Sequence, residues 1–110
     1  MTFDVKFSHE AKANVREIRD WIAKRSQDGA LRWLDSLEQA RTKLSTSANS
    51  FALAPEAEAF DEELRQILFN TRRGNTYRAL FVIRGTTVHV VSVRGTGQEL
   101  VRSDEINLPE

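Results

Sequence analysis

The chain has 110 residues, the size of one ordinary domain, so we expect a single domain over residues 1–110. It contains no cysteine, which excludes disulfide bonds, thiolate metal sites and cysteine nucleophiles. Its 16 basic and 16 acidic residues cancel, and a net charge of zero by itself argues against a nucleic-acid partner. No apolar run reaches the roughly 20 residues of a membrane span. The N-terminus also lacks the apolar stretch of a secretory signal, so we expect a cytoplasmic protein without membrane contact.

The N-terminal half predicts one strand and two helices. Apolar and polar residues alternate over residues 2–7, which is typical of a strand with one buried face. A helix over residues 9–24 follows, because apolar residues recur at spacings of three and four and Ser8 can cap the first turn. Residues 26–29 are polar and turn-prone, and the helical spacing resumes over residues 30–44. Two helices joined by a short loop predict an antiparallel αα-hairpin.

The C-terminal half predicts strands. Residues 45–60 show no period and are expected to form a loop with one irregular turn of helix. Three segments rich in Ile, Val, Phe and Tyr then predict strands over residues 64–70, 77–84 and 87–94. The tail from about residue 96 is polar, with little to bury. The order β-α-α-β-β-β predicts an α+β fold, with the N-terminal αα-hairpin packed on one face of an antiparallel sheet.

A two-residue turn at Gly85 and Thr86 fixes the predicted register of the last two strands. In that register one sheet face carries most of the bulky aromatic side chains and should meet the helices. The other face is expected to be open, cationic and partly apolar, which is typical of a binding surface. This face comprises Arg78, Leu80, Val82, Arg84, His89, Val91 and Val93.

The charges are segregated along the chain. Residues 64–94 carry six arginines and no acidic residue, whereas residues 54–63 carry five acidic residues and no basic one. One interpretation is a basic surface for an acidic partner. The other is that the arginines keep an exposed sheet soluble, with Arg78 in an ion pair with the acidic segment.

Catalytic and metal-binding patterns are weak. His9 and His89 have no cysteine or clustered carboxylates near them in sequence, so we predict no metal site and no cofactor. No nucleophile and base arrangement and no Gly-rich phosphate loop can be identified. Trp21 and Trp33 are expected to pack between the helices.

Several short segments together resemble the RelE/ParE toxins of bacterial type II toxin–antitoxin systems, closest to the ParE-like, plasmid-stabilisation members. The matching segments are Phe7-Ser8-His9-Glu10-Ala11, Ile18 to Ala23, Ala30 to Trp33, Leu64-Arg65-Gln66-Ile67 and Tyr77-Arg78-Ala79-Leu80-Phe81. The likeness covers about residues 3–95, and it is the order and spacing of the segments that is specific. The resemblance implies a RelE/ParE-like fold and a cognate antitoxin as partner.

The resemblance also implies one of two activities on the same fold. RelE-like members are metal-independent nucleases that cleave mRNA on the ribosome, which would make Arg65, Arg78 and His89 the candidate catalytic residues. ParE-like members inhibit DNA gyrase without nuclease chemistry. Residues 95–101 lack the Tyr, His or Lys that such nucleases carry there. This departure favours ParE-like binding to gyrase, with an mRNA endonuclease and an inactive antitoxin-binding module as the alternatives.

The open face of the sheet is also the predicted binding surface for target and antitoxin. We expect an acidic, disordered antitoxin segment to wrap the helices and reach this sheet. The predicted contact residues are Arg65, Arg78, Leu80, Val82, Arg84, Val91 and Val93.

Overall fold

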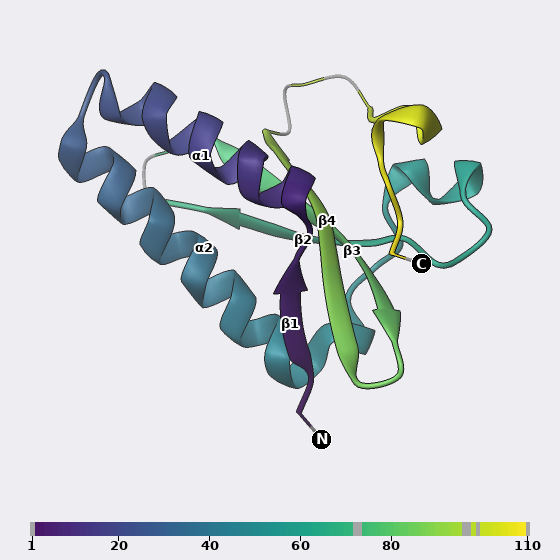
Figure 1. The fold of residues 1–110 in the computed structure, drawn as a ribbon. Helices are drawn as coiled ribbons and strands as arrows, with labels where there is room; N and C mark the ends of the chain where they lie inside the picture. Colours follow the sequence, from purple (N-terminus) through teal and green to yellow (C-terminus); the bar gives the residue numbers. More distant parts are fainter. Residues whose placement is uncertain (1, 72–73, 96–97, 99, 110) are drawn as a thin grey trace.

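The computed structural model describes residues 2–71, 74–95, 98 and 100–109, and it has two helices packed on a four-stranded sheet (Figure 1). The elements are β1 (Asp4–Phe7), α1 (His9–Ala23), α2 (Gln27–Ser47), β2 (Arg65–Asn70), β3 (Thr76–Arg84) and β4 (Thr87–Gly95). Short 3-10 turns lie at η1 (Ala48–Ser50), η2 (Pro55–Ala59) and η3 (Ser103–Glu105). The predicted α+β class and the order β-α-α-β-β-β are confirmed. Within these residues no helix is long and apolar enough to cross a membrane.

A serine side chain caps the N-terminus of each helix. The Ser8 hydroxyl accepts a hydrogen bond from the Ala11 amide at 3.1 Å, as the sequence predicts. The Ser26 hydroxyl accepts one from the Gly29 amide at 2.8 Å, so α2 begins at Gln27, inside the stretch predicted as a turn. Such a cap contributes about 1 kcal/mol to helix stability.

The sheet has the strand order β1-β4-β3-β2. β2, β3 and β4 are antiparallel, as predicted, but β1 pairs parallel to β4, with Val5 beside Val88. The sheet is therefore mixed rather than wholly antiparallel. β1 and β4 are joined by the whole intervening domain instead of a hairpin, and alternation within a strand carries no information about pairing direction across such a connection.

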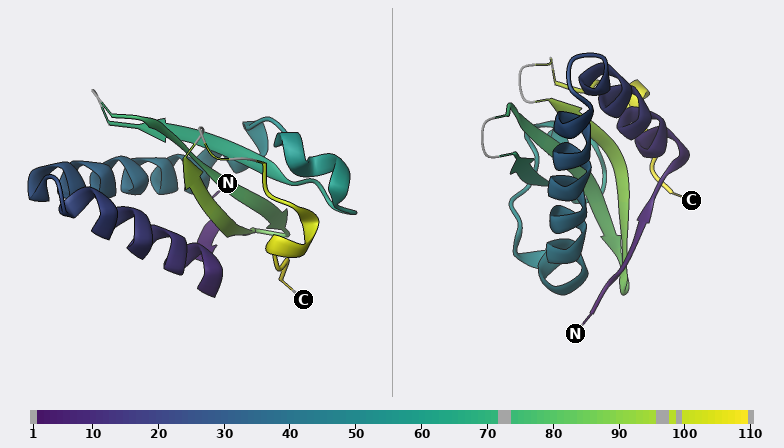
Figure 2. Two further views of the ribbon diagram at one scale, coloured as in Figure 1. Left: turned by 90° about the horizontal axis from the view of Figure 1, so that it is seen from above. Right: turned by 90° about the vertical axis from the view of Figure 1, so that its left-hand side faces the viewer.

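The main core lies between the helices and the sheet, and Figure 2 shows both helices on the same side of that sheet. Trp33, Leu37 and Leu44 of α2 belong to this core together with the sheet residues Phe81 and Val90. The Trp33 ring also meets Tyr77 edge-on, with centroids 5.5 Å apart. Trp33 is thus buried, but its ring contacts are with Phe69 and Tyr77 of the sheet and not the packing between the helices that we expected.

A β-bulge changes the register of the β3–β4 hairpin. Val82 pairs with His89, as predicted, but Leu80 pairs with Ser92 instead of Val91. The extra residue on β4 turns Val93 to the helix side, where it belongs to the main core. The prediction that Val93 lies on the open face is wrong, because regular alternation was assumed through a bulged strand.

A second, smaller core lies on the opposite face of the sheet. It contains Ala54, Leu64, Leu80, Val82, Val91, Val101 and Ile106. The C-terminal tail, which we expected to bury little, supplies Val101 and Ile106, each about 5% exposed. Figure 1 shows this tail beside η2, at the end of the molecule away from the hairpin tip. Single apolar residues in a polar stretch give no periodic signal, so the sequence did not reveal the contact.

Candidate functional site

Arg78 is buried in an ion pair with Glu56 of η2. The two side chains are 5% and 1% exposed, and Arg78 Nη1 donates to Glu56 Oε1 at 2.7 Å. A second guanidinium nitrogen donates to Glu56 Oε2, which also accepts from the Val101 amide at 3.0 Å. Burial alone would raise the pKa of Glu56, but the hydrogen bonds from Arg78 and Val101 outweigh it and lower that pKa. The predicted alternative, an ion pair between Arg78 and the acidic segment, is confirmed.

The other predicted arginines also have carboxylate partners within the chain. Arg84 Nε lies 3.3 Å from Glu62 Oε2, and the hydrogen bond from Arg84 lowers the pKa of Glu62. Arg65 donates to Glu63 at 2.7 Å and to the Phe51 carbonyl. The acidic segment before β2 therefore neutralises the basic strands that follow it. The role of these arginines in partner binding stays a prediction.

The apolar part of the predicted surface is covered. Leu80, Val82 and Val91 are at most 2% exposed, because residues 54–64 and the C-terminal tail pack over them. The prediction that this face is open is therefore wrong for the structure described.

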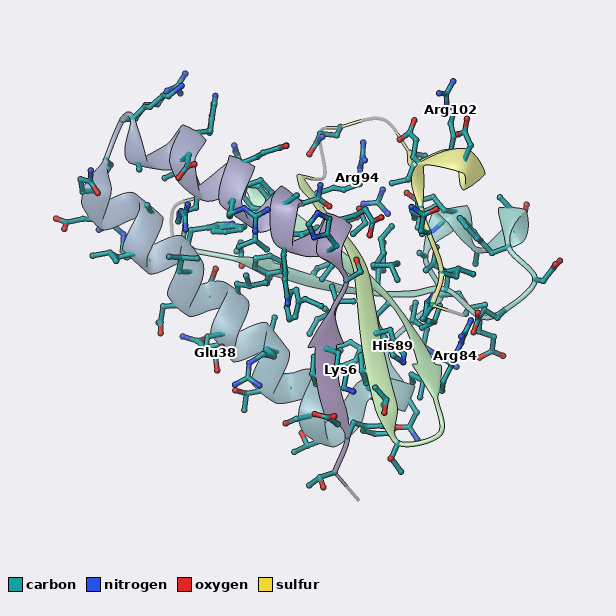
Figure 3. The ribbon with its side chains drawn as sticks, viewed as in Figure 1. Lys6, Glu38, Arg84, His89, Arg94 and Arg102 are labelled. Carbon is teal, nitrogen blue, oxygen red and sulfur yellow. The ribbon has the colours of Figure 1, made fainter. Side chains whose placement is uncertain are left out.

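The three candidate catalytic residues do not converge. Arg65 pairs with Phe81 across the sheet, so it lies on the helix-side face, opposite to Arg78. His89 pairs with Val82, four residues along β3 from Arg78, a separation of about 13 Å. Figure 3 shows His89 near Arg84, far from the tip of the helical hairpin formed by α1 and α2. The described residues thus contain no cluster in which a base, an acid and a phosphate-binding arginine meet.

A groove lies between the helices, where α1 and α2 diverge from the hairpin tip towards β1 (Figure 1). Its volume is about 790 Å³. The apolar lining residues are Val5, Phe7, Val15, Leu34 and Leu37. The charged lining residues are Lys6, Lys12, Arg16, Arg41 and Glu38. Four basic residues and one acidic residue give the rim a net positive charge, above an apolar floor.

The edge of the sheet borders this groove. β1 is the terminal strand of the sheet, with β4 on one side only. The Asp4 and Ser8 amides bond to carbonyls of the β4 side, so by alternation the Val5 and Phe7 amides point to the outer edge. An outer edge of this kind can pair with an extended segment of another chain.

This groove is not among the surfaces predicted from the sequence, although the sequence contains one signal for it. Lys12 and Arg16 are one helical turn apart and flank Val15, so a cationic edge borders the apolar stripe of α1. The prediction that Trp21 packs between the helices is wrong, since its side chain is 50% exposed. Over the described part of the chain no group of three or more His, Asp or Glu residues could hold a metal ion.

Comparisons with known proteins give one family. The family described as "ParE toxin of type II toxin-antitoxin system, parDE" matches residues 5–100. No curated protein sequence matches the chain. A solved structure described as "Chromosomal ParDE TA system from P. aeruginosa" contains a similar chain, with a TM-score of 0.62 and 17% sequence identity. The similarity covers 86% of this chain and 96% of that one, and at this identity it shows the fold alone.

Proposed function

Because the chain belongs to the ParE toxin family of type II toxin–antitoxin systems, we propose that it arrests bacterial growth by binding DNA gyrase and that a cognate antitoxin neutralises it. The observation that carries the choice of target is the dispersal of the nuclease candidates. Arg78 is held by Glu56, and Arg65 lies on the other face of the sheet. RNA cleavage needs groups that activate the hydroxyl, stabilise the phosphate and protonate the leaving oxygen at one place.

The residues near the end of the last strand also favour protein binding over RNA cleavage, because they include no effective proton donor among those described. Gly95 stands where related nucleases often carry histidine, and Tyr77 opposite it is only 9% exposed. Burial raises the pKa of Tyr77, which makes its phenol a poorer source of protons near neutral pH.

We assign the antitoxin to the groove between α1 and α2. A disordered acidic segment suits this surface, because apolar residues can cover Val15 and Leu34 while carboxylates meet the basic rim. Val5 and Phe7 offer backbone amides at the strand edge for an extended part of the same segment.

Induction of the chain in a bacterium tests the proposed activity. Growth is expected to stop, cleaved DNA to accumulate, and co-expression of the neighbouring antitoxin gene to restore growth. Codon-phased mRNA fragments without DNA damage would instead identify a ribosome-dependent nuclease. Continued growth at normal expression of the soluble chain would identify an inactive binding module.

Charge reversal at the groove tests the antitoxin assignment. The double substitution Lys12→Glu, Arg16→Glu is expected to leave growth arrest intact and to weaken antitoxin binding at least tenfold, about 1.4 kcal/mol. The reason is that two attractive charge contacts become repulsive. Titration of the purified chain with antitoxin measures the change.

Lys43→Glu is the matched control, because this exposed residue of α2 does not line the groove. Its antitoxin affinity should stay within about twofold of the unsubstituted chain. Equal antitoxin affinity for the double variant and this control would remove the groove from the antitoxin site.

A further inference from the structure

An aromatic and cationic hollow lies at the tip of the helical hairpin, beside Trp21. The hollow measures about 510 Å³, and it is lined by residues at the end of α1 and the start of α2 together with Thr71, Gly74, Asn75 and Tyr77. Half of the Trp21 surface is exposed, and the Arg25 guanidinium lies over its ring, 4.5 Å from the centroid. Trp, Tyr and Arg are the residues that most often dominate binding energy at protein interfaces. Trp21, Trp33, Tyr77 and Arg32 all line this hollow.

The polar groups of the hollow favour a ligand that carries a negatively charged hydrogen-bond acceptor. Arg32 is its charged lining residue, and no carboxylate lines it among the described residues. Neither Arg25 nor Arg32 forms an ion pair with any residue that the structure describes. Trp33 is 1% exposed, and its indole Nε1 has no hydrogen-bond partner in the described structure.

The hollow is separate from the antitoxin groove. No residue lines both, and along α1 the groove residue nearest to Trp21 is Arg16, five residues or about 7.5 Å away. The two surfaces can therefore be altered independently.

We propose that this hollow is the docking site for the target protein and that it receives an acidic side chain flanked by apolar residues. The proposal rests on the proposed function, because the target there is DNA gyrase. The carboxylate meets Arg32, and the flanking residues cover Trp21 and Ile22. Arg25 remains over the Trp21 ring.

The test is binding of purified DNA gyrase to the purified chain and to single variants. Trp21→Ala and Arg32→Gln are each expected to weaken binding at least tenfold, whereas Arg32→Lys keeps the charge and loses less than Arg32→Gln. Leu31→Ala is the matched control, since Leu31 is 65% exposed on the same hairpin but does not line the hollow. Its gyrase affinity should change less than twofold. Antitoxin affinity should be unchanged in all four variants, which checks that each is folded.

The outcomes separate this inference from the proposed function. If gyrase binds the unsubstituted chain, and Trp21→Ala and Arg32→Gln bind it as well as Leu31→Ala does, the hollow is not the docking site while the proposed function stands. If gyrase does not bind the unsubstituted chain, the proposed target and this assignment both fail.

Discussion

Replacement of Arg78 by alanine is expected to lower the free energy of unfolding by about 3–5 kcal/mol, the cost of breaking a buried ion pair from one side. The substitution leaves the Glu56 carboxylate 1% exposed, with the Val101 amide but without its guanidinium partner. The loss should appear in thermal and urea unfolding of the purified chain. At about 4–8 °C for each kcal/mol, the melting temperature would fall by roughly 12–40 °C.

The double variant Arg78→Met, Glu56→Leu is the informative comparison, because apolar replacement of both partners removes the unpaired charge. It should recover most of the lost stability. Arg102→Ala controls for loss of a surface pair, since the Arg102 side chain is 75% exposed and such pairs contribute at most about 1 kcal/mol. A loss below about 1 kcal/mol in Arg78→Ala would contradict a structural role for the pair.

Removal of the C-terminal tail by ending the chain at residue 99 should have the second large effect. Val101 and Ile106 are nearly buried, and each such side chain contributes about 1.5–3 kcal/mol when removed from water. Ordering the tail offsets part of that gain, so we expect a net loss of about 2–4 kcal/mol. The shortened chain would expose Leu80, Val82 and Val91 and should bind a hydrophobic dye.

A chain shortened by residues 109–110 alone is the control, since it keeps Val101 and Ile106. Its stability and dye binding should match the full chain. Unchanged unfolding of the chain that ends at residue 99 would show that the tail adds nothing to the second core.

Much of the fold follows from residue periodicity. Spacings of three and four predict α1 and α2, and alternation predicts β1, because a single buried face generates each pattern. The hairpin turn at Gly85 was also predictable, and this glycine has the positive φ of 60° that its turn requires. These features depend on neighbours in sequence.

The errors concern relations between distant residues. The bulge at Val91 and the burial of Val101 both depend on contacts that no local pattern encodes. The candidate surfaces were missed for the same reason, since the groove combines three elements and the hollow brings the tip of the helical hairpin together with Thr71, Gly74 and Asn75. Charge segregation was visible and left two interpretations open, of which internal ion pairing is the one that the structure shows.

The parallel pairing of β1 with β4 constrains when the molecule can fold during synthesis. Asp4 pairs with Thr87, 83 positions later in the chain, so the sheet has a large sequence separation between its first strand and that strand's neighbour. The ribosome releases β1, α1 and α2 before it has synthesised β4, the strand with which β1 pairs. Since β1 forms the floor of the groove and Tyr77 lines the hollow, neither surface is complete on a nascent chain that lacks its last third. Incomplete translation products of this gene should therefore be unable to present either surface to a partner.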